Sequence, residues 1–255
     1  MSLRTTYPKL PGRVYFFGTC LVDMLYPEAG LAGMQLIRRE GVEVFFPRNQ
    51  TCCGQPAWNS GYRDEARKVA SAQMACFPQD YPIVVPSGSC AGMLRHHYPE
   101  LFSGTPQHNA ALAFSERVFE LTEFLSQVLK IELSDLGKPV KVALHVSCSA
   151  RREMGVAGEH QALLQQLKNV ELVEPGRKEE CCGFGGTFAV KHAQISAAMV
   201  EEKATELVAT GADALVSGDC GCLMNITGHL DYRKENLPGD HIASFLWERT
   251  NATDS

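Results

Sequence analysis

The stretch Glu180-Cys-Cys-Gly-Phe-Gly-Gly-Thr187 places two adjacent cysteines directly before a glycine. Neighbouring cysteines seldom form a disulfide with each other, but both thiols can turn toward one metal centre when the next residue frees the backbone. The same triplet occurs earlier in the chain, as Cys52-Cys53-Gly54. One such triplet would be a weak signal, whereas two of them indicate a repeated metal-binding unit.

Single cysteines flank both triplets at matching distances. The gap between the first single cysteine and the triplet is 31 residues in one half and 32 in the other, and the gap from the glycine to the last cysteine is 35 and 38. Ordinary buried cysteines would not recur twice in the same order, so the spacing predicts an internal duplication. The two sets are Cys20, Cys52, Cys53 and Cys90, followed by Cys148, Cys181, Cys182 and Cys222.

Short apolar runs that are rich in β-branched residues alternate with segments of helical periodicity. Strands are expected at residues 13–17, 42–46, 81–85, 140–145, 170–173 and 214–217. Helices are expected at residues 28–40, 62–76, 115–131, 159–167, 187–209 and 241–249. This alternation implies parallel sheets covered by helices. The sequence therefore predicts an α/β fold with two pseudo-symmetric domains, each a parallel sheet flanked by helices, and the turn at 135–138 divides them into residues 1–136 and 137–255.

Composition excludes several classes of protein. The 255 residues are 45% hydrophobic, with a formal net charge of −5 and no run of lysine or arginine, so neither nucleic acid nor an anionic membrane is an expected partner. The sequence has no apolar segment of membrane-spanning length, and its first residues do not resemble an export signal. Its 10 cysteines are therefore expected in a reducing compartment, the cytoplasm, where they would bind metal.

The cysteines follow the predicted strands, and the carboxyl ends of parallel strands are where ligands collect. Four convergent thiolates suit either a tetrahedral zinc ion or an iron–sulfur cluster. Structural zinc usually takes two Cys-x-x-Cys hooks, whereas adjacent cysteines can each hold a different iron, so the pattern favours iron and sulfide. A helix that begins at Thr187 would also direct its positive end toward the site. Zinc stays an alternative for one of the two sites.

The doubled pattern resembles the cysteine-rich CCG domain family, which is found in heterodisulfide reductase and in the iron–sulfur subunit of glycolate oxidase. The resemblance covers about residues 14–247 and is greatest to the lactate-utilization members of that family. It rests on the runs Thr51-Cys-Cys-Gly-Gln-Pro56, Pro86-Ser-Gly-Ser-Cys-Ala-Gly-Met93, Cys181-Cys-Gly-Phe-Gly-Gly-Thr-Phe188 and Gly221-Cys-Leu-Met-Asn-Ile226.

This resemblance implies an iron–sulfur electron-transfer subunit with up to two clusters, expected to be of the 4Fe-4S type. Such a subunit acts with two partners, a ferredoxin-type iron–sulfur protein and a third subunit, to oxidise L-lactate to pyruvate. It carries no catalytic residue of its own. Two alternatives stay open: a disulfide or thiol reductase subunit like the CCG-containing one of heterodisulfide reductase, and a structural zinc-binding scaffold.

The sequence departs from the broad family at one position in each half. Ser87 and Asp219 stand where the family has the first cysteine of its final Cys-x-x-Cys. Cys220 is a candidate replacement ligand, and its place in the sequence assigns it to the second half. Asp219 is expected to be either an oxygen ligand or a helix N-cap. His145 is expected to be a satisfied core histidine or a tuner of the cluster, and Cys76 is expected to be a core residue.

Overall fold

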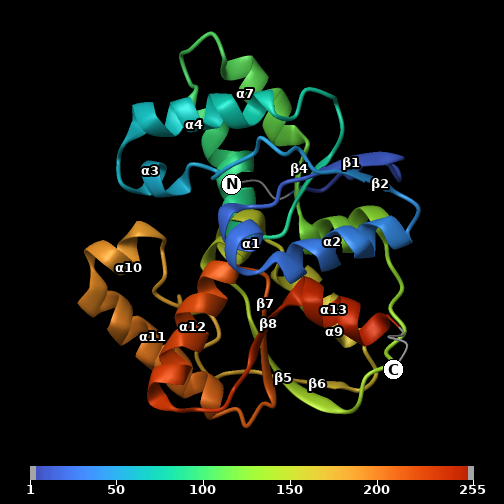
Figure 1. Cartoon of the computed structure of the whole chain (residues 1–255), viewed down its shortest axis with the longest axis vertical. Coiled ribbons are helices and arrows are strands. Elements are labelled where there is room, and N and C mark those ends of the chain that lie inside the picture. Colours follow the sequence, from blue (N-terminus) through green and yellow to red (C-terminus); the bar gives the residue numbers. More distant parts are fainter. Residues whose placement is uncertain (1–3, 252–255) are drawn as a thin grey trace.

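The computed structural model describes residues 4–251, which form two similar halves, one above the other in Figure 1. The first half contains a four-stranded parallel sheet in the order β2-β1-β3-β4. Its strands are β1 (Arg13–Phe16), β2 (Glu43–Phe45), β3 (Ile83–Val85) and β4 (Val118–Glu120). Three of these strands were predicted, and all three lie within the predicted ranges.

The second half repeats the same topology. Its sheet has the order β6-β5-β7-β8, again with every neighbouring pair parallel. The strands are β5 (Val140–His145), β6 (Val170–Val173), β7 (Ala214–Ser217) and β8 (Gly239–His241). The predicted α/β fold with two related halves and parallel sheets is therefore confirmed. Each sheet has one strand more than the sequence indicated, β4 in one and β8 in the other.

Helices cover both sheets (Figure 1). In the first half they are α1 (Cys20–Leu25), α2 (Pro27–Arg39), α3 (Gln55–Asn59), α4 (Arg63–Ala75), α5 (Gly88–Gly92), α6 (Tyr98–Leu101), α7 (His108–Glu116) and α8 (Leu121–Glu123), with π-helical turns η1 (Met93–His97) and η2 (Phe124–Leu129). In the second half they are α9 (Ala157–Gln165), α10 (Thr187–Lys191), α11 (Ala193–Val208), α12 (Cys220–Arg233) and α13 (Ile242–Thr250), with the π-helical turn η3 (Ala150–Met154).

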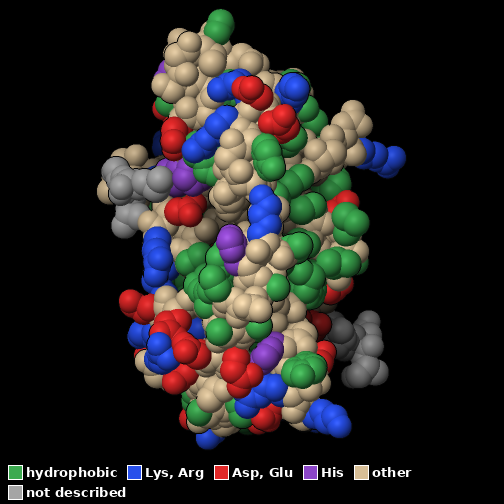
Figure 2. Space-filling view, turned by 90° about the vertical axis from the view of Figure 1, so that its left-hand side faces the viewer, with side chains coloured by type: hydrophobic (Ala, Val, Ile, Leu, Met, Phe, Trp, Pro, Cys, Tyr) green, Lys and Arg blue, Asp and Glu red, His purple; other side chains and the backbone are tan. Residues whose placement is uncertain are grey.

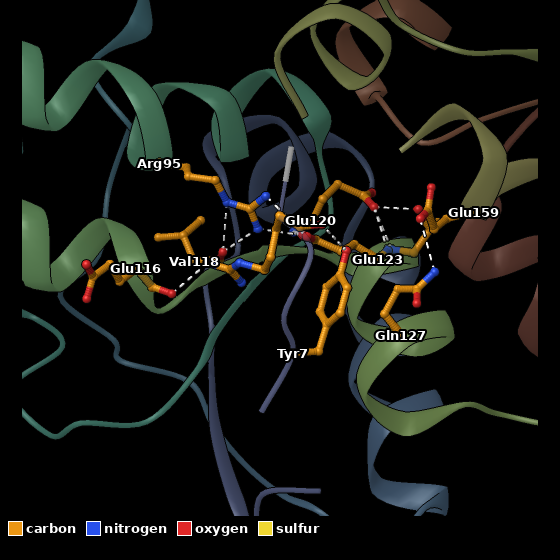
Figure 3. A network of polar contacts seen from close by, with 10 residues as sticks. Tyr7, Arg95, Glu116, Val118, Glu120, Glu123, Gln127 and Glu159 are labelled. Carbon is orange, nitrogen blue, oxygen red and sulfur yellow. Dashed lines mark hydrogen bonds and ion pairs between the residues drawn. The ribbon is translucent and has the colours of Figure 1, made fainter. Parts of the chain in front are cut away.

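Two predicted helices are wrong in part. The helix expected at 187–209 is interrupted at His192, whose φ of −127° ends α10 and precedes α11. The helix expected at 115–131 contains β4, which pairs with β3. Figure 3 shows why the chain extends there: the guanidinium of Arg95 donates to the carbonyl oxygen of Val118 at 3.0 Å and pairs with the carboxylate of Glu123. The side chain of Glu120 then caps α8 by accepting from the N–H groups of Thr122 and Glu123.

One of the hydrophobic core clusters extends across both halves. Buried side chains from β1, such as Val14 and Phe16, belong to the same cluster as Val142 of β5 and Val216 of β7. Helices α2 and α13 pack against each other across the boundary. The core therefore joins the halves, and the division at residues 136 and 137 stays a prediction.

The predicted boundary turn is held by an ion pair. Asp135 accepts hydrogen bonds from the Nε and Nη2 atoms of Arg249 at 3.0 and 2.9 Å, although 114 residues separate them in the sequence. The Asp135 carboxylate is fully covered, and the Arg249 side chain is 10% exposed. The turn is thus fastened to the last helix, α13.

Figure 2 shows the face that carries α3, α10 and α11. Apolar side chains gather across its middle, and charged side chains are densest toward its lower end. Helix α10 contributes Val190, which is 82% exposed, and α11 contributes Ile195, which is 55% exposed. No helix within residues 4–251 combines the length and the apolar character that crossing a bilayer requires.

Candidate functional site: two clusters of cysteines

The first cysteine of each set lies just beyond the carboxyl end of a strand. Cys20 begins α1 shortly after β1 ends, and Cys148 follows β5 at the corresponding place. Thr19, directly before Cys20, has a φ of 49°, a conformation that is uncommon for a threonine. Its hydroxyl accepts a hydrogen bond from the N–H group of Val22 at 3.3 Å and so caps α1. The chain is therefore turned sharply at the point where the first thiol enters the site.

Both Cys-Cys-Gly triplets adopt the same turn. Gly54 has a φ of 87° and Gly183 a φ of 82°, a region that favours glycine. In each turn the glycine N–H points back at the sulfur two residues earlier, at 3.4 Å from Cys52 Sγ and from Cys181 Sγ. A side chain at position 183 would lie 2.8 Å from the carbonyl oxygen of Ser196. The glycine thus allows the turn, and the turn supplies an amide to the first sulfur of the pair.

The first-half cysteines line a partly open cavity of about 150 Å³. All four members of the set line it, so the loops after β1, β2 and β3 converge on one spot. Cys220 lines the same cavity, together with Phe184 and Gly221 from the second half. A side chain at Gly221 would lie 2.6 Å from the Phe184 ring, so this end of α12 is tightly packed against the loop that follows the second triplet. Sequence position assigned Cys220 to the second half, but the structure brings it to the cavity of the first.

The second-half cysteines also lie together. The Sγ atoms of Cys148 and Cys181 are 4.0 Å apart. The sulfurs of Cys182 and Cys222 and a ring nitrogen of His145 all lie within 4.8 Å of one another, and all three residues are buried. This second group is a candidate metal site that mixes thiols with an imidazole.

The environment of the thiols favours a thiolate in each half. Hydrogen bonds from the thiols of Cys20 and Cys53 lower the pKa of Cys52 to about 3. Hydrogen bonds from Cys148 and Cys182 lower the pKa of Cys181 to about 2. The amide of the following glycine acts in the same direction at both positions. The first cysteine of each pair is therefore ionised at neutral pH, in the form that binds metal.

The second cysteine of each pair behaves in the opposite way. Interaction with the ionised neighbour Cys52, then with Cys90, and burial raise the pKa of Cys53 well above the usual value. In the second half, interaction with Cys181 and Cys222 raises the pKa of Cys182 in the same manner. A buried thiol of this kind ionises when a cation is present to compensate its charge. Both halves therefore combine a ready thiolate with thiols that a metal would deprotonate.

His145 is not a satisfied core histidine, contrary to that expectation. Its side chain is 2% exposed, and its Nε2 atom has no hydrogen-bond partner among the residues that the structure describes. Burial, followed by the charge of Lys203, lowers the pKa of His145 to about 3, so the ring is neutral at neutral pH. A buried nitrogen without a partner costs about 1–3 kcal/mol. The alternative prediction was that His145 tunes a cluster, and its ring lies beside Cys182 and Cys222.

Asp219 stands at the predicted N-cap position, but its side chain bonds other groups. It occupies the N-cap position of α12, but its side chain makes no capping hydrogen bond there. Its Oδ1 atom instead accepts from the hydroxyls of Ser87 and Ser89 at 2.8 and 2.7 Å, and its Oδ2 atom accepts from the hydroxyl of Ser147 at 2.6 Å. The Ser89 N–H adds a further bond at 3.2 Å. Both carboxylate oxygens are therefore engaged in joining the halves.

Some residues lie outside both cysteine clusters. Cys76 lies at the end of α4, packs against the core of the first half and donates to the carbonyl oxygen of Ala72 at 3.3 Å. A larger cavity of about 860 Å³ is lined by Arg4, Arg95 and Arg117 but by no cysteine. Arg95 is already occupied by Glu123 and by a backbone carbonyl.

Two serines of the site were missed by sequence reasoning. The hydroxyls of Ser89 and Ser147 reach Asp219 across 130 and 72 positions of sequence. Serines beside a cysteine are common in loops, and no spacing links these two to each other or to the aspartate. Ser89 reaches the aspartate only once the two halves are brought together, and Ser147 only once β5 and β7 lie side by side in their sheet.

Comparison with known protein families shows which proteins this chain is similar to. Residues 14–95 and 142–227 each match the cysteine-rich domain family known as CCG. The chain is 45% identical to lactate utilization protein A of Bacillus velezensis over 240 residues, which covers 93% of this chain and 100% of that protein. It is 44% identical to the protein of the same name from Bacillus subtilis, again with 93% and 100% covered.

Solved structures support the fold. The crystal structure of a hypothetical protein from Helicobacter pylori superposes with a TM-score of 0.68 at 11% identity, covering 99% of this chain and 52% of that chain. At such low identity the likeness concerns the fold alone. The two family matches and the extended similarity to the Bacillus proteins carry the assignment: the chain belongs to the cysteine-rich CCG domain family and, within it, to the group of lactate utilization protein A.

Proposed function

We propose that the protein is an iron–sulfur electron-transfer subunit of a multi-protein complex that oxidises L-lactate to pyruvate. The observation that carries the proposal is the pair of cysteine clusters, each built from three loops at the carboxyl end of a parallel sheet. The name of the Bacillus relatives supports the physiological setting.

The donor set fits such clusters. Each half offers four sulfur donors, and one of them is already a thiolate at neutral pH. The donors are buried or half-buried, so a bound cluster would be shielded from bulk water. Thiolate ligands are those that iron–sulfur clusters prefer. In the first half they would be Cys20, Cys52, Cys53 and Cys90, with Cys220 as an additional candidate, and in the second half Cys148, Cys181, Cys182 and Cys222.

A bound 4Fe-4S cluster supplies one-electron transfer at a potential set by its surroundings. The chain's own residues hold and tune it. The glycine amides at 54 and 183 donate toward a sulfur ligand, which stabilises negative charge there. Cys20, Cys52, Cys148 and Cys181 are half-buried, which places one side of each set near the surface where a partner could approach.

The proposal divides the reaction between proteins. Oxidation of lactate to pyruvate releases two electrons and two protons, and the chemistry at the hydroxyl carbon belongs to a partner. We expect the partners to be a ferredoxin-type iron–sulfur protein and a third subunit, and we expect this protein to pass the two electrons between redox carriers of those partners, one at a time.

Anaerobic purification tests the proposal. The protein should be brown and should contain iron and acid-labile sulfide in equal amounts, about eight of each per chain if both centres are of the 4Fe-4S type. The reduced protein should give an electron paramagnetic resonance (EPR) signal. Colourless protein that takes up neither iron nor sulfide during reconstitution would contradict the proposal, and stoichiometric zinc in both halves would favour a structural scaffold.

A second candidate, a disulfide or thiol reductase, has one observation in its favour. The thiolate of Cys181 lies 4.0 Å from the thiol of Cys148 and borders an open cavity that also contacts Lys191 and His192. This function requires turnover of a disulfide by the isolated protein with a strong reductant, and loss of that turnover in Cys181→Ser. Protein that carries its clusters yet leaves every disulfide substrate intact would exclude it.

A further inference from the structure

His145 is the last residue of β5 and lies beside the second cysteine set. Its ring is almost fully covered, and the Nε2 atom lacks a partner among residues 4–251. A ring nitrogen lies within 4.8 Å of the sulfurs of Cys182 and Cys222, which lie equally close to each other. A buried polar atom without a partner is rare in folded proteins, and an absent ion is one of the explanations for it.

The fold does not require a histidine at this position. In the first half the equivalent residue, three positions before the first cysteine, is Phe17. Phe17 is fully buried, belongs to the hydrophobic core and stacks on Phe77 with ring centroids 5.8 Å apart. An aromatic hydrocarbon therefore fills the same place in the same fold, whereas the imidazole of His145 brings a ring nitrogen close to two sulfurs.

The donor chemistry is that of a transition-metal site. Ligands of one tetrahedral ion with bonds of about 2.0–2.3 Å lie about 3.3–3.8 Å from each other, so the three donor atoms need only a small movement to reach one ion. Thiolate and imidazole together suit iron and zinc. Neutral imidazole binds through the nitrogen that faces the metal, and His145 is not held by another bond at Nε2 within the described part of the chain.

We propose that His145 is a ligand of the second centre, which makes that centre a mixed sulfur–nitrogen site, whereas the first centre is bound by sulfur alone. The inference rests on the proposed function in one respect, namely that the metal is the iron of a cluster. It concerns a residue outside the Cys-Cys-Gly pattern, and it assigns different chemistry to the two halves. Imidazole carries no charge where a thiolate carries one, so a centre that has an imidazole among its ligands is less negative and easier to reduce than one bound by thiolates alone.

The experiment isolates the second centre and looks for its nitrogen. A variant with both Cys52→Ser and Cys53→Ser removes the first centre, and the reduced protein is then examined by pulsed EPR. The expected result is a strong coupling to nitrogen that changes from the pattern of ¹⁴N to that of ¹⁵N when the cells are fed ¹⁵N-histidine. This isotope comparison needs no change at position 145, so it is independent of the folding of any histidine variant.

Two histidine variants complete the test. His145→Phe, which copies the residue of the first half, should lose the coupling and shift the reduction potential of the second centre. His160→Gln changes another buried histidine, one that bonds Thr122. This variant should keep the nitrogen coupling and the reduction potential of the wild type. An unchanged spectrum after ¹⁵N labelling would overturn the assignment of His145.

The outcomes separate this inference from the proposed function. Iron and sulfide at the second centre without histidine coupling would contradict the role of His145 and leave the electron-transfer proposal standing. Zinc at the second centre, retained in the wild type and lost in His145→Phe, would support ligation by His145 and contradict an iron–sulfur cluster in that half.

Discussion

The two halves of the molecule keep the same strand order, the same glycine turns and the same four thiols, yet they differ in the residues around those thiols. Phe17 in the first half corresponds to His145 in the second, and Gly88 corresponds to Cys220. Duplication thus preserved the backbone that presents sulfur, while the neighbouring side chains diverged. The comparison indicates that one fold carries two cysteine clusters with different surroundings.

The clearest difference lies where the halves meet. Ser87 and Asp219 occupy equivalent positions, and here a hydroxyl of one half donates to a carboxylate of the other at 2.8 Å. Both stand where the broader family has a cysteine. The two departures from the family pattern therefore contact each other, and each accounts for the other: a carboxylate needs donors, and the serines provide them.

Removing one centre at a time should have the largest effect. We expect Cys52→Ser with Cys53→Ser to abolish the first centre, Cys181→Ser with Cys182→Ser to abolish the second, and each pair to lower iron and sulfide by about half. Metal analysis with EPR of both variants tests this. Loss of all iron from either variant would show that the centres assemble together and are not separate.

Asp219→Ala should destabilise the whole molecule. The substitution leaves three hydroxyls and one N–H group in a buried place without their acceptor, so we expect a loss of about 3 kcal/mol in the free energy of unfolding. Denaturant titration of the metal-free protein measures it. Asp231→Ala, an exposed change on the same helix, is the matched control and should change stability by less than about 0.5 kcal/mol.

The two glycine turns should differ in their tolerance of a side chain. Gly54→Ala meets nothing nearer than the Val69 side chain at 3.4 Å, an ordinary contact, so the left-handed backbone sets its cost at about 1–2 kcal/mol. Gly183→Ala carries the same backbone cost and also approaches the Ser196 carbonyl oxygen at 2.8 Å, so its cost should be larger. The same denaturant titration checks the order. Equal losses would contradict it, and Gly158→Ala, with open space around it, serves as the control.

The smallest change is expected in thiol reactivity with pH. Because the pKa values of Cys52 and Cys181 are about 3 and 2, both stay ionised between pH 7 and pH 5, and their alkylation rates in metal-free protein should change less than about twofold. Burial raises the pKa of Cys76, so its rate should fall about tenfold for each unit of pH. Mass spectrometry of the alkylated peptides measures each rate. A tenfold fall per unit at Cys181 would mean that it is a neutral thiol.

The local pattern of apolar residues was sufficient to predict most of the fold. The runs before Cys20, Cys148 and Cys222 are apolar and short, and the structure has strands at all three. Strand β4 was missed because Val118–Glu120 is three residues long and lies inside a segment with helical periodicity. Pairing with β3 and the bonds from Arg95 determine its conformation, and both depend on residues far away in the sequence.

The site was predictable where its residues repeat and unpredictable where they do not. The eight repeated cysteines could be found from spacing alone, because each follows a strand that delivers it to a known edge of a sheet. The positions of His145, Asp219 and Cys220 depend on contacts between the halves or on a missing partner. Such contacts leave no periodic signal in the chain, so sequence neighbours misassigned Cys220 to its own half.

The amides of Gly54 and Gly183 have an evolutionary consequence. They belong to the backbone, so a substitution of a neighbouring side chain leaves in place the dipole that each aims at a sulfur, whereas a proline at position 54 or 183, which lacks the N–H, would remove it. Between the two halves of this chain the differences lie around that shared element, at positions such as 17 and 145 or 88 and 220. A duplicated copy of this fold therefore keeps a backbone dipole beside its first paired sulfur, and changes in the surrounding side chains need no new means of holding sulfur.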